Sequence, residues 1–258
     1  PATAGPKPGG LRKINKEDWA SFVDAWSTNL PVPITPADLF KSLMATVAEA
    51  EKKICVIEKT PHHVNYIDRI LWHLPEAKFI ILVRGAYSFM LSYKHQGDRK
   101  RTEVRDHFKK LYHPLGCALV WRGYYRSAAS AYSLHSRRSL RLLFESLAND
   151  SFKALREVET FLGLEDCSLR LAKDVDRNSS FTEDAKPELS SADVFWMNLI
   201  SKAEMHEFGE VMQPVSLLSW DICKSFLVLP LWAIRTFIYI LSCSTGNPLN
   251  YLLRIIRH

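Results

Sequence analysis

The stretch from residue 54 to residue 93 constrains the fold more than any other part of the chain. It opens with an apolar run at residues 54–57, closes on a second run at residues 78–84, and carries a helical pattern between them. Thr60 suits a helix N-cap and Pro61 suits the first helical position, where no backbone donor is needed. Apolar residues at three- and four-residue spacing predict one buried stripe: Val64, Ile67, Ile70, Leu71 and Leu74.

The two apolar runs predict a βαβ unit. Leu74 precedes Pro75, which disfavours helical geometry, so the helix is expected to end there after about four turns. A connection this short predicts two neighbouring parallel strands. Ligands of open parallel sheets bind beyond the carboxyl ends of the strands, which would put Glu58 and Arg84 at one rim, about one strand spacing apart. A carboxylate beside a cation there can serve a proton transfer next to an anionic leaving group.

A phosphate site is predicted after the second strand. Gly85 allows a tight turn behind Arg84, a further helix is expected to begin, and Ser92 follows the arginine by eight residues. A helix start offers backbone N–H donors and the positive end of the helix dipole. Arg84 and Ser92 are therefore predicted to bind one phosphate group, and the alternative is that Arg84 is a structural residue at the strand end.

At these residues the sequence resembles the sulfotransferases that use 3′-phosphoadenylyl sulfate (PAPS). Those proteins carry a Glu-Lys-Thr-Pro loop, a helix ending in Leu-Pro-x-Ala-Lys-Phe-Ile, and a strand ending in arginine with serine eight positions later. The resemblance continues at residues 140–147, 154–156 and 161–164, where the family has a strand, an acidic turn and a helix closing on Phe-Leu-Gly. It covers residues 45–212.

The resemblance implies an α/β fold, with a parallel sheet flanked by helices as in P-loop NTPases. It also implies transfer of a sulfuryl group from PAPS, without a metal, to a hydroxyl or amine of a glycan, lipid or small molecule. In this reading Arg84 and Ser92 bind the 3′-phosphate of the nucleotide, Glu58 is the general base, and Lys59 could neutralise charge at the bridging oxygen. The alternative for Glu58 is a solvated loop carboxylate paired with Lys59. His62 and His63 either assist proton transfer or are surface histidines.

The sequence departs from the family pattern at three places. Gly85 and Ala86 follow the arginine, where relatives usually have Asp-Pro or Asn-Pro, and Phe144 replaces a tyrosine that many relatives place near the adenine. The glycine-rich loop that binds the 5′-phosphosulfate is also not evident, because residues 7–10 are a poor substitute. We expect this loop to lie upstream of Pro1.

Two other classes of protein are alternatives to a sulfotransferase. If the phosphosulfate loop has been lost, the chain is a non-catalytic nucleotide-binding or scaffold protein of the same fold. A phosphoryl-transfer enzyme of the P-loop class is disfavoured, because the sequence has no Gly-x-x-x-x-Gly-Lys-Ser/Thr motif.

The composition limits which partners the protein could bind and which cellular compartment it suits. The net charge of +6 suits a protein that handles phosphates, sulfates or an anionic membrane. The basic run at residues 94–110 is either a solvated helix and loop or an electropositive lip over an anionic ligand, and nucleic acid binding is not expected. Five cysteines without paired spacing fit a reducing compartment. We therefore expect a cytoplasmic protein or one associated with a membrane, the Golgi membrane if the source is eukaryotic.

The predicted organisation has three parts: a lead-in with N-terminal helices at 1–44, a sulfotransferase-like domain at 45–212, and a hydrophobic tail at 213–258. Residues 225–243 carry a single charge, Arg235, in an apolar helical segment. A spanning helix needs about 20 mainly apolar residues, and a central arginine opposes insertion. The favoured prediction is contact with a membrane surface through residues 216–257, and the alternatives are a true span or packing on the protein body or on a partner.

Overall fold

The computed structural model describes residues 24, 28, 35–50, 52–53, 55–98, 102–164 and 187–243. Most of the predicted lead-in at 1–44, the loop candidate at 7–10 and the end of the tail at 244–258 lie outside these residues. The chain divides into two compact units, Pro1–His63 with Asp68–Pro75, and Val64–Ile67 with Glu76–His258. The three-part division into 1–44, 45–212 and 213–258 stays a prediction.

The first unit contains helix α2 (Pro36–Ala50), whose start is fixed by a capping box. The backbone N–H of Asp38 donates to the Thr35 hydroxyl, and the backbone N–H of Thr35 donates to the Asp38 carboxylate, both at 3.2 Å. The hydrogen bonds from Thr35 lower the pKa of Asp38. Farther along, the predicted helix is present as a 3₁₀ turn, η2 (Pro61–Tyr66), that continues into α3 (Ile67–His73) and ends before Pro75 as expected.

The predicted strand at residues 54–57 is wrong. Residues 55–60 are described and form no strand, and the side chain of Ile57 is 80% exposed. These residues pair with neither β1 nor β2 and Ile57 is not buried, so the short apolar run lacks the paired, half-buried surface on which a strand depends. The predicted βαβ unit is therefore also wrong, together with the argument that placed Glu58 one strand spacing from Arg84.

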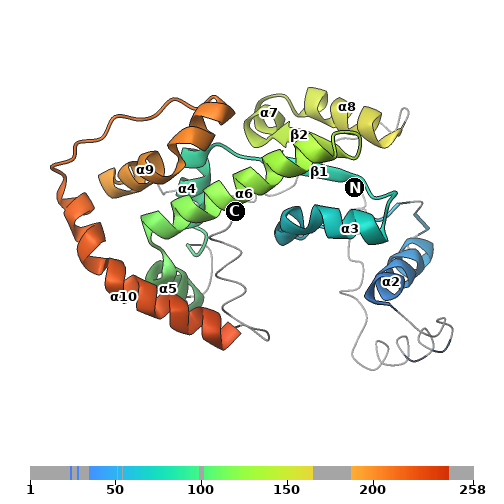
Figure 1. Cartoon of the computed structure of the whole chain (residues 1–258), viewed down its shortest axis with the longest axis horizontal. Helices are drawn as coiled ribbons and strands as arrows, with labels where there is room; N and C mark the ends of the chain where they lie inside the picture. The colour runs from blue at the N-terminus through green and yellow to red at the C-terminus, as the bar shows by residue number, and fades with distance from the viewer. Residues whose placement is uncertain are drawn as a thin grey trace, which may run out of the picture. The chain divides into compact units, whose positions relative to one another are not determined.

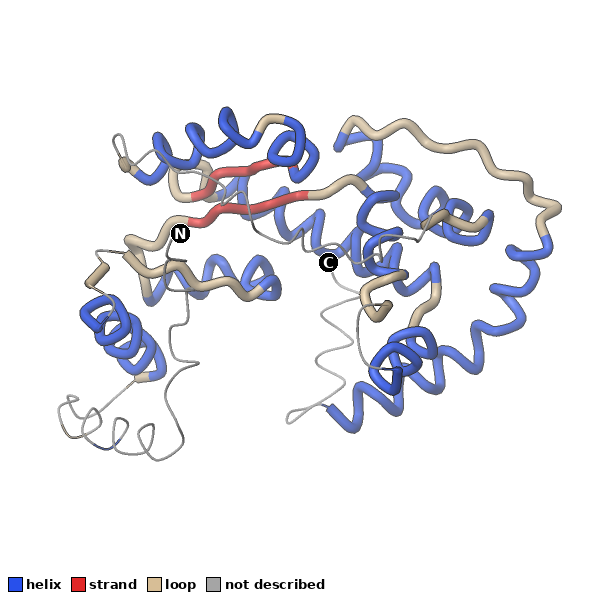
Figure 2. Tube along the Cα trace, turned by 180° about the vertical axis from the view of Figure 1, so that it is seen from behind, coloured by secondary structure: helices blue, strands red, loops and turns tan. Residues whose placement is uncertain are grey.

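The second unit is built on a parallel pair of strands, β1 (Phe79–Val83) and β2 (Ser139–Leu143), which lie side by side in Figure 2. The register pairs Phe79 with Ser139 and Val83 with Leu143, so the two carboxyl ends lie together. The connection between the strands contains α4 (Ala86–Lys94), α5 (Thr102–Leu111) and α6 (Pro114–Leu134). After β2 come α7 (Phe144–Asn149) and α8 (Ser151–Leu162), and Figure 1 shows helices flanking the strands. The predicted fold class, a parallel sheet flanked by helices, is confirmed.

The core of the second unit lies between α6 and α9 (Ser191–Phe208). Trp121 stacks on Tyr125 with ring centroids 5.1 Å apart, and the edge of Phe208 meets both rings. Gly209 follows α9 at φ +87°, the left-handed conformation that commonly ends a helix and that glycine adopts without strain. The left-handed glycine therefore ends α9 directly after Phe208, the residue that packs on the aromatic rings of α6.

Helix α10 (Trp220–Cys243) also belongs to the second unit and follows an extended segment after α9 (Figure 1). One stripe of its side chains packs on the rest of this unit. Ile222 and Ser225 are buried, and Trp232 donates its indole N–H to the Leu111 carbonyl at 2.8 Å. A Cβ on Gly116 of α6 would lie 2.5 Å from the Trp232 ring, so the docking depends on a glycine there. Residues Trp220–Leu241 are long and apolar enough to cross a membrane by length and composition alone, and no other helix among the described residues is.

Candidate functional site

The carboxyl ends of β1 and β2 form the candidate site of the second unit. Arg84 directly follows β1, as predicted, and its guanidinium lies over the ring of Phe144, the first residue after β2, at 4.5 Å. The indole N–H of Trp121 donates to the Arg84 carbonyl at 2.9 Å and fixes the backbone at the strand end. Burial lowers the pKa of Arg84 and Glu145 opposes this shift, but an arginine stays protonated at neutral pH. Arg84 is therefore a cation whose backbone is fixed by Trp121 and whose guanidinium packs on the Phe144 ring.

A hydrogen-bond network joins Arg84 to the first turn of α4. The guanidinium Nε donates to the Ser88 hydroxyl at 3.2 Å, and this hydroxyl donates to Glu145 Oε1 at 2.9 Å. Ser92 lies on the same helix, one turn beyond Ser88, and is partly buried. Since residues four apart share a helix face, Ser88 and Ser92 lie on one side of α4. The role of Ser92 at a phosphate stays a prediction.

Two carboxylates occupy the start of α4, where a phosphate was predicted. The backbone N–H of Gly85 donates to Glu145 at 3.0 Å, and the N–H groups of Ala86 and Tyr87 donate to Glu210. Burial raises the pKa of Glu210, and the Glu145 carboxylate adds to this, while the bonds from Ala86 and Tyr87 oppose it. The positive end of the α4 dipole is thus neutralised from within the chain.

Tyr87 holds this arrangement against α9. Its hydroxyl donates to the side-chain carbonyl of Asn198 and accepts the backbone N–H of Gln213 at 2.7 Å. The Gln213 segment, which carries Glu210, is therefore tied to α4 and α9 at two points. An open cavity of about 460 Å³ lies beside it, lined by these residues: Tyr87, Ser88, Leu91, Glu188, Leu189 and Gln213.

Sequence reasoning missed three residues of this site. Ser88 follows Arg84 by one helical turn, and Glu145 follows the end of β2, so the strand-end rule that found Arg84 could have found both. Glu210 contacts Ala86 across 124 residues of sequence, and no local pattern signals that contact.

Glu58 belongs to the first unit, whereas Arg84 and Ser92 belong to the second. Its carboxylate accepts hydrogen bonds from the Thr60 hydroxyl and, at 2.7 Å, from His63 Nδ1. The Thr60 side chain is thus engaged by Glu58, and Thr60 receives the N–H of His63 through its backbone carbonyl, not as the predicted side-chain cap. Glu58 remains one-third exposed at its side chain, and Lys59 is exposed.

The Glu58–His63 pair has the chemistry of a proton acceptor. A carboxylate that is oriented by two neighbours and still reached by solvent can accept a proton from a bound hydroxyl group. The predicted pairing of Glu58 with Lys59 is not among the ion pairs of the described residues, where His63 takes that place. No group of three or more metal-ligating side chains occurs among the described residues.

Comparison with known proteins assigns the family. The family model described as "Sulfotransferase family" matches residues 9–167, which include both strands, Arg84, Ser92 and Glu58. Searches of curated proteins and of solved structures give no match. The match covers more than half of the chain, so this protein belongs to the sulfotransferase family.

Proposed function

We propose that this protein transfers a sulfuryl group from PAPS to a hydroxyl or amine of a glycan, lipid or small molecule. The observation that carries the proposal is Arg84, held over Phe144 where β1 and β2 end, inside the region that matches the sulfotransferase family. In the reaction the acceptor oxygen or nitrogen attacks sulfur, and the bond from sulfur to the bridging phosphate oxygen breaks. Adenosine 3′,5′-bisphosphate leaves with that electron pair, and the acceptor proton passes to Glu58.

Arg84 and Ser92 are proposed to bind the 3′-phosphate of the nucleotide. A guanidinium presents donors in a planar fork that matches a phosphate, and the Phe144 ring behind it limits its movement. The Ser88 hydroxyl, which already accepts from Arg84, is close enough to join such a site. Lys59 is proposed to offset charge on the bridging oxygen, and positioned cations and N–H donors can stabilise the transferring group without a metal.

Titration with adenosine 3′,5′-bisphosphate by calorimetry tests the nucleotide site. Arg84→Ala is expected to weaken binding about 10- to 100-fold, because it removes charge-assisted hydrogen bonds that are each worth about 1.5–3 kcal/mol. Arg84→Lys keeps the charge and should lose less. Ser92→Ala and Ser88→Ala, compared side by side, identify which serine contacts the phosphate.

Arg138→Ala is the matched control for this titration. Arg138 precedes β2 at the opposite end of the same strands, where it pairs with Glu76 at 3.1 Å. Its removal should leave the affinity unchanged. Equal loss in Arg84→Ala and Arg138→Ala would contradict a phosphate site at Arg84 and would indicate non-specific charge attraction.

A non-catalytic protein of the same fold is the second candidate, and the carboxylates at the start of α4 favour it. Glu210 and Glu145 fill the N–H donors that a phosphate would use. Under the sulfotransferase proposal, the nucleotide must displace the Glu210 carboxylate from these N–H groups. Glu210→Gln is then expected to strengthen nucleotide binding several-fold, because one nearby negative charge is removed.

The pH dependence of nucleotide affinity tests whether Glu210 competes with the ligand. Because the pKa of Glu210 is raised, this residue gains a proton earlier than an exposed glutamate as the pH falls from neutral. At neutral pH the wild-type protein should bind the nucleotide more weakly than Glu210→Gln does. As the pH falls and Glu210 is protonated, the wild-type affinity should approach that of the variant. The nucleotide's own phosphates also titrate, with a second pKa of about 6, but this effect is common to both proteins and cancels. A gap that is the same at every pH would mean that Glu210 does not compete with the ligand.

Contact with a membrane surface is part of the proposal. The side of α10 that faces away from its docked stripe is apolar and exposed, and its residues are Leu227, Leu231, Ile234, Phe237, Ile238 and Leu241. An exposed apolar helix face of this length is typical of proteins that lie on a bilayer. The acceptor would then be met at the membrane, with the protein facing a reducing compartment.

A further inference from the structure

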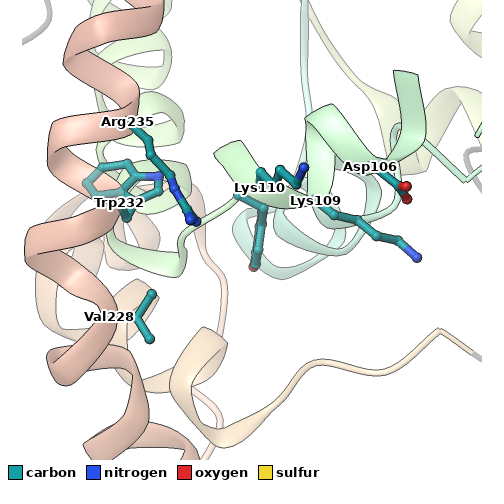
Figure 3. Close-up of a pocket in the computed structure, with 7 residues that line it drawn as sticks. Asp106, Lys109, Lys110, Val228, Trp232 and Arg235 are labelled. Atoms are coloured by element: carbon teal, nitrogen blue, oxygen red, sulfur yellow. The ribbon is translucent and has the colours of Figure 1, made fainter. Parts of the chain in front are cut away.

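A basic cavity lies between α5 and α10, away from the strand ends. It has a volume of about 350 Å³. Figure 3 shows Val228, Trp232 and Arg235 on α10, and Asp106, Lys109 and Lys110 on α5. Tyr112 completes the lining. We call this site the α5–α10 cavity.

The charges of the α5–α10 cavity favour an anion. It is lined by three cationic side chains and one carboxylate, and that carboxylate, Asp106, already lies 3.8 Å from Arg105. Lys109, Lys110 and Arg235 have no ion-pair partner among the described residues. Unpaired cations that line a cavity raise the local concentration of anions.

The walls of the cavity are held in place by contacts that do not use these cations. Trp232 donates its indole N–H to Leu111, and the Tyr112 hydroxyl donates to the buried carboxylate of Asp193. His113 packs on Trp232 with ring centroids 4.9 Å apart. The aromatic groups are therefore structural, and Lys109, Lys110 and Arg235 are the groups that remain to bind a ligand.

The position of Arg235 on α10 indicates the source of the anion. At about 100° per residue, Arg235 projects about 60° from Trp232, between the docked stripe and the exposed apolar face. Lys224 projects from the same border. When the apolar face of a helix enters a bilayer, the lipid phosphates lie at the edge of that face, beside any cationic side chains located there. A free phosphate would not account for the apolar surface beside the cavity.

We propose that the α5–α10 cavity binds the headgroup phosphate of an anionic phospholipid while the outer face of α10 contacts the acyl chains. This proposal rests on the membrane contact proposed above and is independent of the sulfuryl transfer chemistry. It would orient the protein on the membrane, because the cavity lies on one border of the helix only.

Vesicle flotation with the full chain tests the proposal. Wild-type protein is expected to bind vesicles of phosphatidylcholine mixed with phosphatidylglycerol more tightly than vesicles of phosphatidylcholine alone. Each cation near an anionic surface contributes about fivefold in affinity, so the triple variant Lys109→Gln, Lys110→Gln, Arg235→Gln should lose about 100-fold on the mixed vesicles. Its binding to neutral vesicles should not change.

Two sets of variants make the outcomes distinct. Lys153→Gln, Lys202→Gln and Arg137→Gln together remove the same charge from exposed positions elsewhere, and this variant should keep its preference for anionic vesicles. If it loses as much as the cavity variant, general surface charge explains the binding and the cavity proposal fails. Leu227→Ser with Ile238→Ser should lose binding to both kinds of vesicle, whereas a variant that still binds overturns the membrane contact.

Three further results would overturn the proposal. Equal binding of wild-type protein to neutral and mixed vesicles would leave the membrane contact standing without a headgroup site. Binding of inorganic phosphate at the cavity, lost in the triple variant and unaccompanied by any vesicle preference, would identify a soluble phosphate site instead. Binding to neither vesicle would end both membrane proposals. Calorimetry with adenosine 3′,5′-bisphosphate on the same samples reports separately on the nucleotide site.

Discussion

Replacing Glu58 with glutamine is expected to lower kcat for sulfuryl transfer by about 10²- to 10⁴-fold, the range typical of a lost general base. Glutamine keeps the size and the polarity of the side chain but cannot take up the acceptor proton. The loss should appear in kcat, while the affinity for adenosine 3′,5′-bisphosphate stays the same, since the base acts on the acceptor and not on the nucleotide. Release of this product from PAPS, with octyl glucoside as a hydroxyl-bearing probe acceptor, measures the rate.

Two variants keep this result interpretable. His63→Gln removes the 2.7 Å contact with Glu58 and should give a smaller loss, because it changes the orientation of the base and leaves the carboxylate in place. Glu49→Gln changes an exposed carboxylate of the same unit and should have no effect. Full activity of Glu58→Gln would remove Glu58 from the mechanism, and Glu58 would then be the solvated loop carboxylate of the alternative interpretation.

The sequence was sufficient for those elements that are fixed by local chemistry. The helix that ends before Pro75, the strand before Arg84 and the helix that closes at Gly163 are all present. Each depends on a proline, a glycine or an apolar run whose effect reaches only a few residues. The strand at 54–57 failed because an apolar run becomes a strand only when a partner strand and a buried face are supplied from elsewhere.

In the candidate site, too, the sequence predicts local features but not contacts between distant segments. Arg84 was found because the end of a buried strand can be read from the residues on either side of it. Glu210 could not be found, since it reaches α4 from a segment more than 120 residues away. That contact bears on the proposed phosphate site, because it places a carboxylate where the helix start alone predicted a phosphate. Local reasoning identified the donors correctly but not the group that occupies them.

A second long-range contact, at Asp193, fixes the second unit. The carboxylate is 1% exposed and accepts hydrogen bonds from Lys94 at 2.7 Å, from the Ser190 backbone N–H at 2.8 Å and from the Tyr112 hydroxyl. It therefore joins the end of α4, the segment before α6 and the start of α9. Burial and the Asp193 charge both raise the pKa of Tyr112, so the phenol stays protonated and can donate.

Asp193→Ala is expected to lower the free energy of unfolding by about 3–5 kcal/mol, since it leaves the Lys94 ammonium without its buried partner and breaks the cap of α9. Urea denaturation of wild type and variant measures the change. Asp150→Ala is the matched control: Asp150 also caps a helix, through the N–H of Lys153 at 3.0 Å, but it is exposed and should cost only about 1 kcal/mol. Adding Lys94→Met to Asp193→Ala should cause little further loss of unfolding free energy, because it removes the ammonium group that Asp193→Ala leaves unpaired. Equal costs for Asp193→Ala and Asp150→Ala would show that capping, and not the buried ion pair, is what Asp193 contributes.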